Sequence, residues 1–146
     1  MADLYALEFV GGPDGTLQPP KRLDGRVVSA KKRRTRACKP TTILNVGDRL
    51  YIGKLPQDAV LHTLSVNSDT SFGSTTLSVG TTATPAKYVN AKTMTNTDAP
   101  SLIGPRATVA QQAPVTGDED LFVTIGVAAI PAAVVATFYM EYTIAT

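Results

Sequence analysis

Few side chains in this sequence have the type and spacing that catalysis requires. His62 is the sole histidine, so no Ser–His–Asp or Cys–His pairing can be assembled around a second one. It falls in phase with the apolar Val60 and Leu64, which favours a structural histidine over a catalytic or ligating one, with an interface pH sensor as a further interpretation.

Cys38 is the sole cysteine. Neighbouring Lys39 and nearby Arg36 would lower its thiol pKa if it is exposed, but no base or motif accompanies it, so we interpret it as an incidental thiol.

Two segments have the composition of ligand-binding loops without the full pattern. Asp118, Glu119 and Asp120 could bind a cation through oxygen, but the twelve-residue calcium-loop pattern is missing, so a solvated turn is favoured. Residues 11–15 are glycine-rich, but no GK[ST] follows them, so they do not form a phosphate cradle. No CxxC spacing exists. We therefore expect a non-enzymatic protein with no catalytic residue, cofactor, metal or small-molecule substrate.

The clearest candidate for an interaction is a run of basic residues, which comprises Lys31, Lys32, Arg33, Arg34 and Arg36. Residues 1–42 hold nine Lys/Arg and four Asp/Glu, a net charge of +5, whereas residues 43–146 hold five and eight, a net charge of −3. A segment this charged cannot bury enough apolar surface to offset its ordering entropy alone. We therefore expect residues 1–42 to form an extended basic N-terminal arm that a neighbouring subunit holds.

The basic run admits three interpretations. It could bind nucleic acid, because phosphate contacts require no sequence code. It has no interleaved aromatic residues for base stacking, however, and the domain behind it is acidic, which disfavours nucleic acid. Contact with an acidic groove on a neighbouring subunit, either another protein or a second copy of the chain, is favoured, and a merely solvated run is the third interpretation.

The composition favours an all-β fold. The 146 residues suit one domain, 43% of them are hydrophobic, only 6% are aromatic and Trp is absent, so the core is expected to consist of Val, Leu, Ile and Ala. Thr, Ser, Gly and Pro are abundant and no long helical pattern occurs. The longest apolar run, 127–139, is interrupted by Pro131 and is too short for a membrane helix, and no secretory signal is evident.

Residues 47–80 carry the pattern of three short strands separated by turns. Apolar residues recur at every second position, the signature of half-buried strands. The sets expected to share a face are Leu50 with Ile52, then Val60, Leu64 and Val66 with His62 in phase, and then Thr75, Leu77 and Val79.

The alternation is clearest near the end of the sequence. Residues 121–127 place Leu121, Val123, Ile125 and Val127 on one face, and residues 134–144 alternate in the same way. A reversal at 130–132 lies between them, so we expect these two strands to form an antiparallel hairpin. With seven or eight strands in total, we predict an antiparallel β-sandwich over residues 43–146, either jelly-roll-like or a partly closed barrel.

Residues 43–146 also resemble a group of small virion structural proteins of tailed bacteriophages. The shared features are the GDR opening at 47–49, the IGKLP step at 52–56, SDTSFGSTTLSVG at 68–80, and a closing strand that ends in YTIAT. The resemblance implies a capsid decoration (cement) protein on the surface of the virion, made in the cytoplasm of the bacterial host.

The implied partners are the major capsid protein and further copies of the chain, as a homotrimer or homodimer. The alternatives are a tail or head–tail joining protein, a nucleic-acid-binding protein that uses the basic run, and a carbohydrate-binding module. The last of these usually has exposed aromatic platforms, for which only Tyr51, Tyr88 and Tyr139 are candidates.

Overall fold

The computed structural model describes residues 31–110 and 114–144, so expectations for residues 1–30 lie outside the described residues. The described residues form eight strands and one short helical turn. In chain order these are β1 (Lys32–Cys38), β2 (Arg49–Leu55), β3 (Ala59–Ser68), β4 (Thr76–Gly80), β5 (Val89–Thr93), β6 (Ser101–Gly104), α1 (Ala107–Ala110), β7 (Glu119–Gly126) and β8 (Ala136–Ile144).

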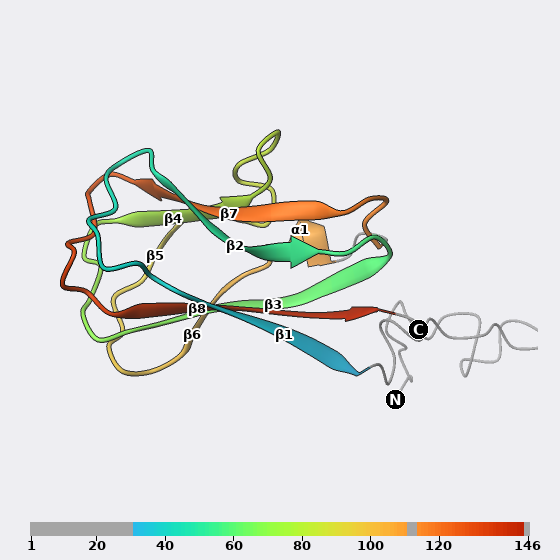
Figure 1. Cartoon of the computed structure of the whole chain (residues 1–146), viewed down its shortest axis with the longest axis horizontal. Helices are drawn as coiled ribbons and strands as arrows, with labels where there is room; N and C mark the ends of the chain where they lie inside the picture. Colours follow the sequence, from blue (N-terminus) through green and yellow to red (C-terminus); the bar gives the residue numbers. More distant parts are fainter. Residues whose placement is uncertain (1–30, 111–113, 145–146) are drawn as a thin grey trace, which may run out of the picture.

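The strands form two four-stranded antiparallel sheets that pack as a sandwich (Figure 1). One sheet has the order β1-β8-β3-β6 and the other the order β2-β7-β4-β5. Every connection except the one between β4 and β5 passes from one sheet to the other. Eight antiparallel strands divided in this way form a jelly roll. The predicted all-β antiparallel sandwich is confirmed, and the jelly roll is the closure that the chain adopts.

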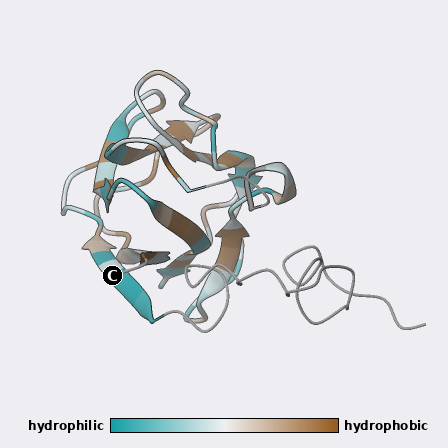
Figure 2. Ribbon diagram, turned by 90° about the vertical axis from the view of Figure 1, so that its right-hand side faces the viewer, coloured by the Kyte–Doolittle hydropathy of each residue, from teal (hydrophilic) through white to brown (hydrophobic). Residues whose placement is uncertain are grey.

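The core lies between the sheets and consists mainly of aliphatic side chains. Figure 2 shows the strands around this core, seen from the end of the molecule at which β1 begins. In β7, Leu121, Val123 and Ile125 are at most 1% exposed, as their alternation predicts. Thr75 and Leu77 share a buried face in the same way.

In the first half of β3, the buried face differs from the predicted one. A register shift next to Leu61, where β3 pairs with β8, marks a β-bulge at His62. The extra residue reverses the alternation, so that Leu61, and not Val60, shares the buried face of Leu64 and Val66. The predicted common face of Val60 and Leu64 was therefore wrong.

The predicted hairpin between residues 121–127 and 134–144 was also wrong, because β7 and β8 lie in different sheets. The segment between them crosses the edge of the sandwich. Ile130 is 1% exposed and forms an isolated bridge with Leu44, which anchors the crossing to the core. Val127, which was expected on the core face, is 69% exposed. Residues 121–125 and 136–140 thus have the predicted faces but different partners. Near the end of β8, Thr143 is 3% exposed although the alternation places it on the outer face.

A buried lysine ties together two loops at the end of the sandwich where these crossings occur. Lys39 is only 8% exposed. Its Nζ donates hydrogen bonds to the carbonyl oxygens of Pro40 at 2.9 Å, Thr42 at 3.0 Å and Ala132 at 3.4 Å. All three N–H donors of the ammonium therefore have acceptors, which offsets the desolvation of the charge.

The face assignment of β8 predicts opposite outcomes for two neighbouring positions. Phe138→Asp places a charge at a position that is 3% exposed and is expected to destabilise the fold by about 4 kcal/mol or more. Thr137→Asp, on the outer face of the same strand, is the matched control and is expected to fold normally. Circular dichroism and thermal unfolding of both variants test this assignment, and a stable Phe138→Asp protein would reverse it.

The Lys39 contacts predict that removing the ammonium group destabilises the fold even when the aliphatic volume of the side chain is kept. Lys39→Met keeps the aliphatic stem but leaves three carbonyl oxygens without their donor, and is expected to lower the free energy of unfolding by about 2 kcal/mol. Lys54→Met, at an exposed position on β2, is the control and is expected to have little effect. Urea denaturation measures both, and equal effects would contradict a structural role for the Lys39 ammonium.

Candidate interaction surface

The basic run lies on a strand at the edge of the sandwich. Residues 32–38 form β1, which pairs antiparallel with β8 from Lys32 opposite Thr143 to Cys38 opposite Thr137. These residues are therefore part of the sheet, whereas the sequence predicted an extended arm over residues 1–42. We call the exposed residues Lys31, Lys32, Arg33, Arg34 and Arg36 the basic edge.

Strand geometry orders the basic edge. The side chains of Lys32, Arg34 and Arg36 lie on the outer face of the sheet, roughly 7 Å apart along the strand. Thr35 is half-buried on the inner side, where a Cβ added at Gly53 of β2 would lie 3.0 Å from its Cγ2 atom. The absence of a side chain at Gly53 thus lets β1 lie close against β2.

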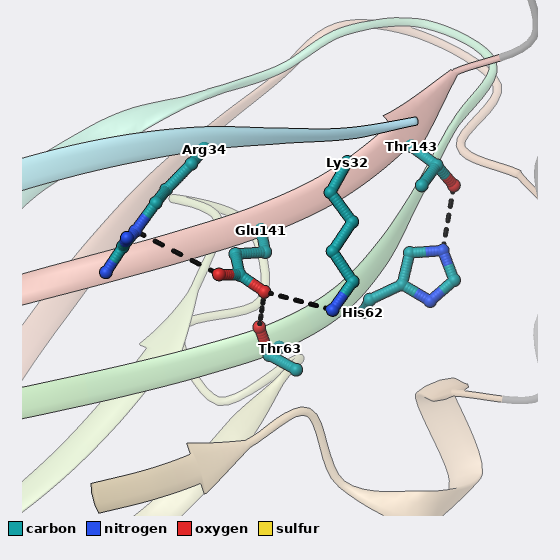
Figure 3. A network of polar contacts seen from close by, with 6 residues as sticks. All are labelled: Lys32, Arg34, His62, Thr63, Glu141 and Thr143. Carbon is teal, nitrogen blue, oxygen red and sulfur yellow. Dashed lines mark hydrogen bonds and ion pairs between the residues drawn. The ribbon is translucent and has the colours of Figure 1, made fainter. Parts of the chain in front are cut away.

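One carboxylate lies among these cations. The Oε2 atom of Glu141 is 3.5 Å from Lys32 Nζ and accepts a hydrogen bond from Thr63 Oγ1 at 3.0 Å. Arg34 Nε is 3.9 Å from Glu141 Oε1 (Figure 3). Glu141 is the only Asp or Glu on the four strands of this sheet, whereas β1 places three cations, Lys32, Arg34 and Arg36, on the outer face. The face therefore keeps an excess of positive charge.

Two further residues of β1, Arg34 and Cys38, make an aromatic and a sulfur contact on the same face. The Arg34 guanidinium lies 4.2 Å from the centroid of the Tyr139 ring, within cation–π range. Hydrogen bonds from Arg36 and Thr137 lower the pKa of the exposed Cys38 thiol, the Arg36 contact being the larger cause. The direction matches the expectation from sequence, and no further role for Cys38 follows from it.

His62 lies beside this network, at the bulge of β3. Its Nε2 atom is 2.8 Å from the Thr143 hydroxyl oxygen, and the side chain is half-buried (Figure 3). This environment agrees with a structural histidine.

The predicted acidic turn does not bring its three carboxylates together. Asp118 accepts a hydrogen bond from the Gln57 amide at 2.8 Å, and Asp120 accepts one from the Tyr51 hydroxyl at 3.3 Å. Glu119 points elsewhere, as described next. In the part of the chain that the structure describes, no group of three or more His, Cys, Asp or Glu residues could hold a metal ion.

A partly buried polar cluster was not foreseen from the sequence. Glu119 accepts hydrogen bonds from Lys87 and from the hydroxyl of Tyr88, which is 2% exposed. Burial, and then the Glu119 carboxylate, raise the pKa of Tyr88 far above its ordinary value. The two partners lie about thirty residues before Glu119, so no local motif signals the contact. The tyrosine stays neutral and links the β4–β5 connection to β7.

A groove of about 580 Å³ lies between β5 and β6. Its lining includes Asn90, Lys92, Leu102 and Arg106 but no carboxylate, histidine or cysteine, so this groove offers no acid–base pair. Among residues 31–110 and 114–144, no helix has the length and apolar character needed to span a bilayer.

The charge imbalance on the outer face of β1-β8-β3-β6 predicts stronger binding to polyanions once Glu141 is neutralised. Glu141→Gln is expected to change the free energy of unfolding by less than about 1 kcal/mol, because its ion pairs are partly solvated. It is also expected to elute from heparin resin at higher salt. Asp120→Asn removes the same charge from the other sheet and serves as the control. Equal shifts for both variants would mean that retention reports net charge and not the basic edge.

No protein-family model and no curated protein matches the chain. Its fold, however, has solved counterparts. A chain of the capsid of Ralstonia phage GP4 matches with a TM-score of 0.58 at 16% sequence identity, covering 80% of this chain and 85% of that one. A chain of the capsid asymmetric unit of cyanophage Pam1 matches with a TM-score of 0.53 at 18% identity, with the same coverage of 80% and 85%. The chain therefore shares its fold with chains found in two phage capsids.

Proposed function

We propose that this chain is a non-enzymatic structural protein of a tailed-phage virion, which binds the capsid lattice and stabilises the head as a decoration (cement) protein. The observation that carries the proposal is the fold similarity to chains of two phage capsids over most of their length and most of this chain. The resemblance of residues 43–146 to small virion proteins points the same way, and it rests on sequence features and not on fold.

The proposed mechanism is stabilisation by linkage. A protein that binds only the intact lattice raises the free energy needed to open it. Many equivalent copies act in parallel, so moderate affinity per copy is sufficient. This mechanism requires no reacting group. It requires binding surfaces that are already ordered before the partner is bound.

The basic edge supplies one such surface. Its side chains are carried by a strand that is hydrogen-bonded to β8, so the charges are already ordered before any partner arrives. Less conformational entropy is lost on binding than for a flexible arm with the same residues. The proposed partner is an acidic surface of the major capsid protein or of a second copy, in a homotrimer or homodimer.

Two alternatives keep specific support. A tail or head–tail joining protein would use the same fold and contacts at another place in the virion, and an image of labelled particles distinguishes the two. The charge excess beside Glu141 also permits nucleic-acid binding. In that case the affinity for DNA would fall steeply with added salt, with a slope set by the number of phosphates contacted.

The decoration proposal predicts saturable binding to particles. Full-length protein is added to particles of the encoding phage that were assembled without it, and bound protein is measured by co-sedimentation. We expect uptake to a fixed number of copies per particle and a higher temperature of particle disruption. Arg33→Glu with Arg36→Glu is expected to weaken binding about tenfold or more, because like charges replace complementary ones.

The matched control is Lys92→Glu, a charge reversal on β5 of the other sheet, which is expected to bind normally. Absence of the chain from purified virions, or binding unaffected by added salt and by the β1 reversals, would contradict the proposal.

A further inference from the structure

The end of the sandwich opposite the start of β1 carries an exposed apolar surface. Four connections meet there: residues 39–48, 69–75, 94–100 and 127–135 (Figure 1). Their exposed large apolar side chains are Ile43, Val46, Val127 and Val135, which are 50–69% exposed. We call these four residues, with the aspartates described below, the loop end.

Hydrogen bonds join the connections into one surface. The Leu44 and Ile130 backbones bond reciprocally at 2.8 and 3.0 Å, and the Gly47 amide donates to the Ile125 carbonyl at 2.8 Å. These bonds hold the connection that carries Ile43 and Val46 against the one that carries Val127. Two further backbone bonds bring in the remaining connections: Asp69 N to Val135 O at 3.0 Å, and Asp98 N to Ser68 O at 2.7 Å.

The charges of the loop end have one sign. Asp48, Asp69 and Asp98 are exposed. The only Lys or Arg in the four connections is Lys39, which is buried and donates to three carbonyl oxygens. The loop end therefore presents apolar side chains with three carboxylates and no exposed Lys or Arg, so the complementary surface is basic.

Val127 indicates that this surface is maintained at the expense of stability. Its φ angle is +69°, and the Ala128 amide donates to the Gly126 carbonyl at 2.8 Å across it, which makes Val127 the centre of a γ-turn. A γ-turn with positive φ is rare and strained, and a β-branched residue is among the least suited to it. Because Val127 is 69% exposed, burial within the monomer does not offset the strain.

We infer that the loop end binds the basic edge of a second copy of this chain, in a head-to-tail contact. A contact between two loop ends would face carboxylates with carboxylates, and one between two basic edges would face cations with cations, so both symmetric arrangements are disfavoured. The pairing of unlike surfaces is complementary in charge, and the Tyr139 ring beneath Arg34 adds apolar area beside the basic edge. Such heterologous contacts close into rings when the rotation between copies allows.

The inference rests on one part of the proposed function, the association of copies of the chain with one another, and identifies the two surfaces that make that contact. Sedimentation velocity on the full-length chain, without particles, measures it directly. We expect self-association that weakens as salt is added, because exposed charges of opposite sign contribute.

Two variants separate association from folding. Val127→Gly is expected to weaken self-association about tenfold, with an unchanged or higher melting temperature, because glycine adopts positive φ without strain. Arg36→Glu is expected to weaken it similarly through the other surface. Leu102→Gly, at the exposed apolar position of β6, and Lys92→Glu on β5 are the matched controls and are expected to associate normally.

Mixing the two variants provides the decisive measurement. Val127→Gly retains an intact basic edge and Arg36→Glu retains an intact loop end, so the mixture is expected to form a 1:1 heterodimer at concentrations at which each variant alone is monomeric. No association of the wild type, association of either variant alone at the wild-type strength, or no rescue on mixing overturns the inference. A monomeric chain that still binds particles would overturn this inference while leaving the proposed capsid binding in place.

Discussion

The position of β8 between β1 and β3 is the constraint on which this structure depends. Its inner face supplies Ala136, Phe138 and Met140 to the core, each at most 3% exposed. Its outer face supplies Tyr139 and Glu141, which hold Arg34 and Lys32 on β1. One strand thus seals the interior and orders the basic edge. A basic segment that could not order itself is ordered because β8 pairs with it along its whole length, from Lys32 to Cys38.

Sequence periodicity predicted faces well and partners poorly. The alternation in 121–125 and 136–140 identified the buried side chains, because alternation depends only on the pleat of the strand itself. It carries no information about which strand lies alongside, so a short connection was interpreted as a hairpin when it crosses between sheets. The bulge at His62 was invisible for a related reason: an inserted residue changes the phase without leaving a mark in composition.

The five residues of the basic edge were identified from composition, but their place on a strand was not. Arg33, Thr35 and Ala37 share the inner side of β1, but Arg33 is exposed, and Thr35 and Ala37 are small and only half-buried, so the hydrophobic pattern there is too weak to detect. Lys39 and Tyr88 were missed because the burial of each depends on a partner that is distant in sequence. For Lys39 this is the Ala132 carbonyl, which adds to the local carbonyls of Pro40 and Thr42, and for Tyr88 it is Glu119. No one-dimensional pattern contains that information.

The topology also has a consequence for how the chain reaches this structure. Cys38 and Thr137, which meet across β1 and β8, are 99 positions apart in sequence, and β8 is the last of the eight strands. During translation β1 and β3 therefore emerge long before the strand that joins them, and their sheet cannot close until β8 has left the ribosome. Pairings this distant in sequence delay folding, since the loop must close before its contacts form. We infer that newly made chains pass through a period in which the aliphatic face of β3 is uncovered, and that this period ends when β8 joins β1 and β3.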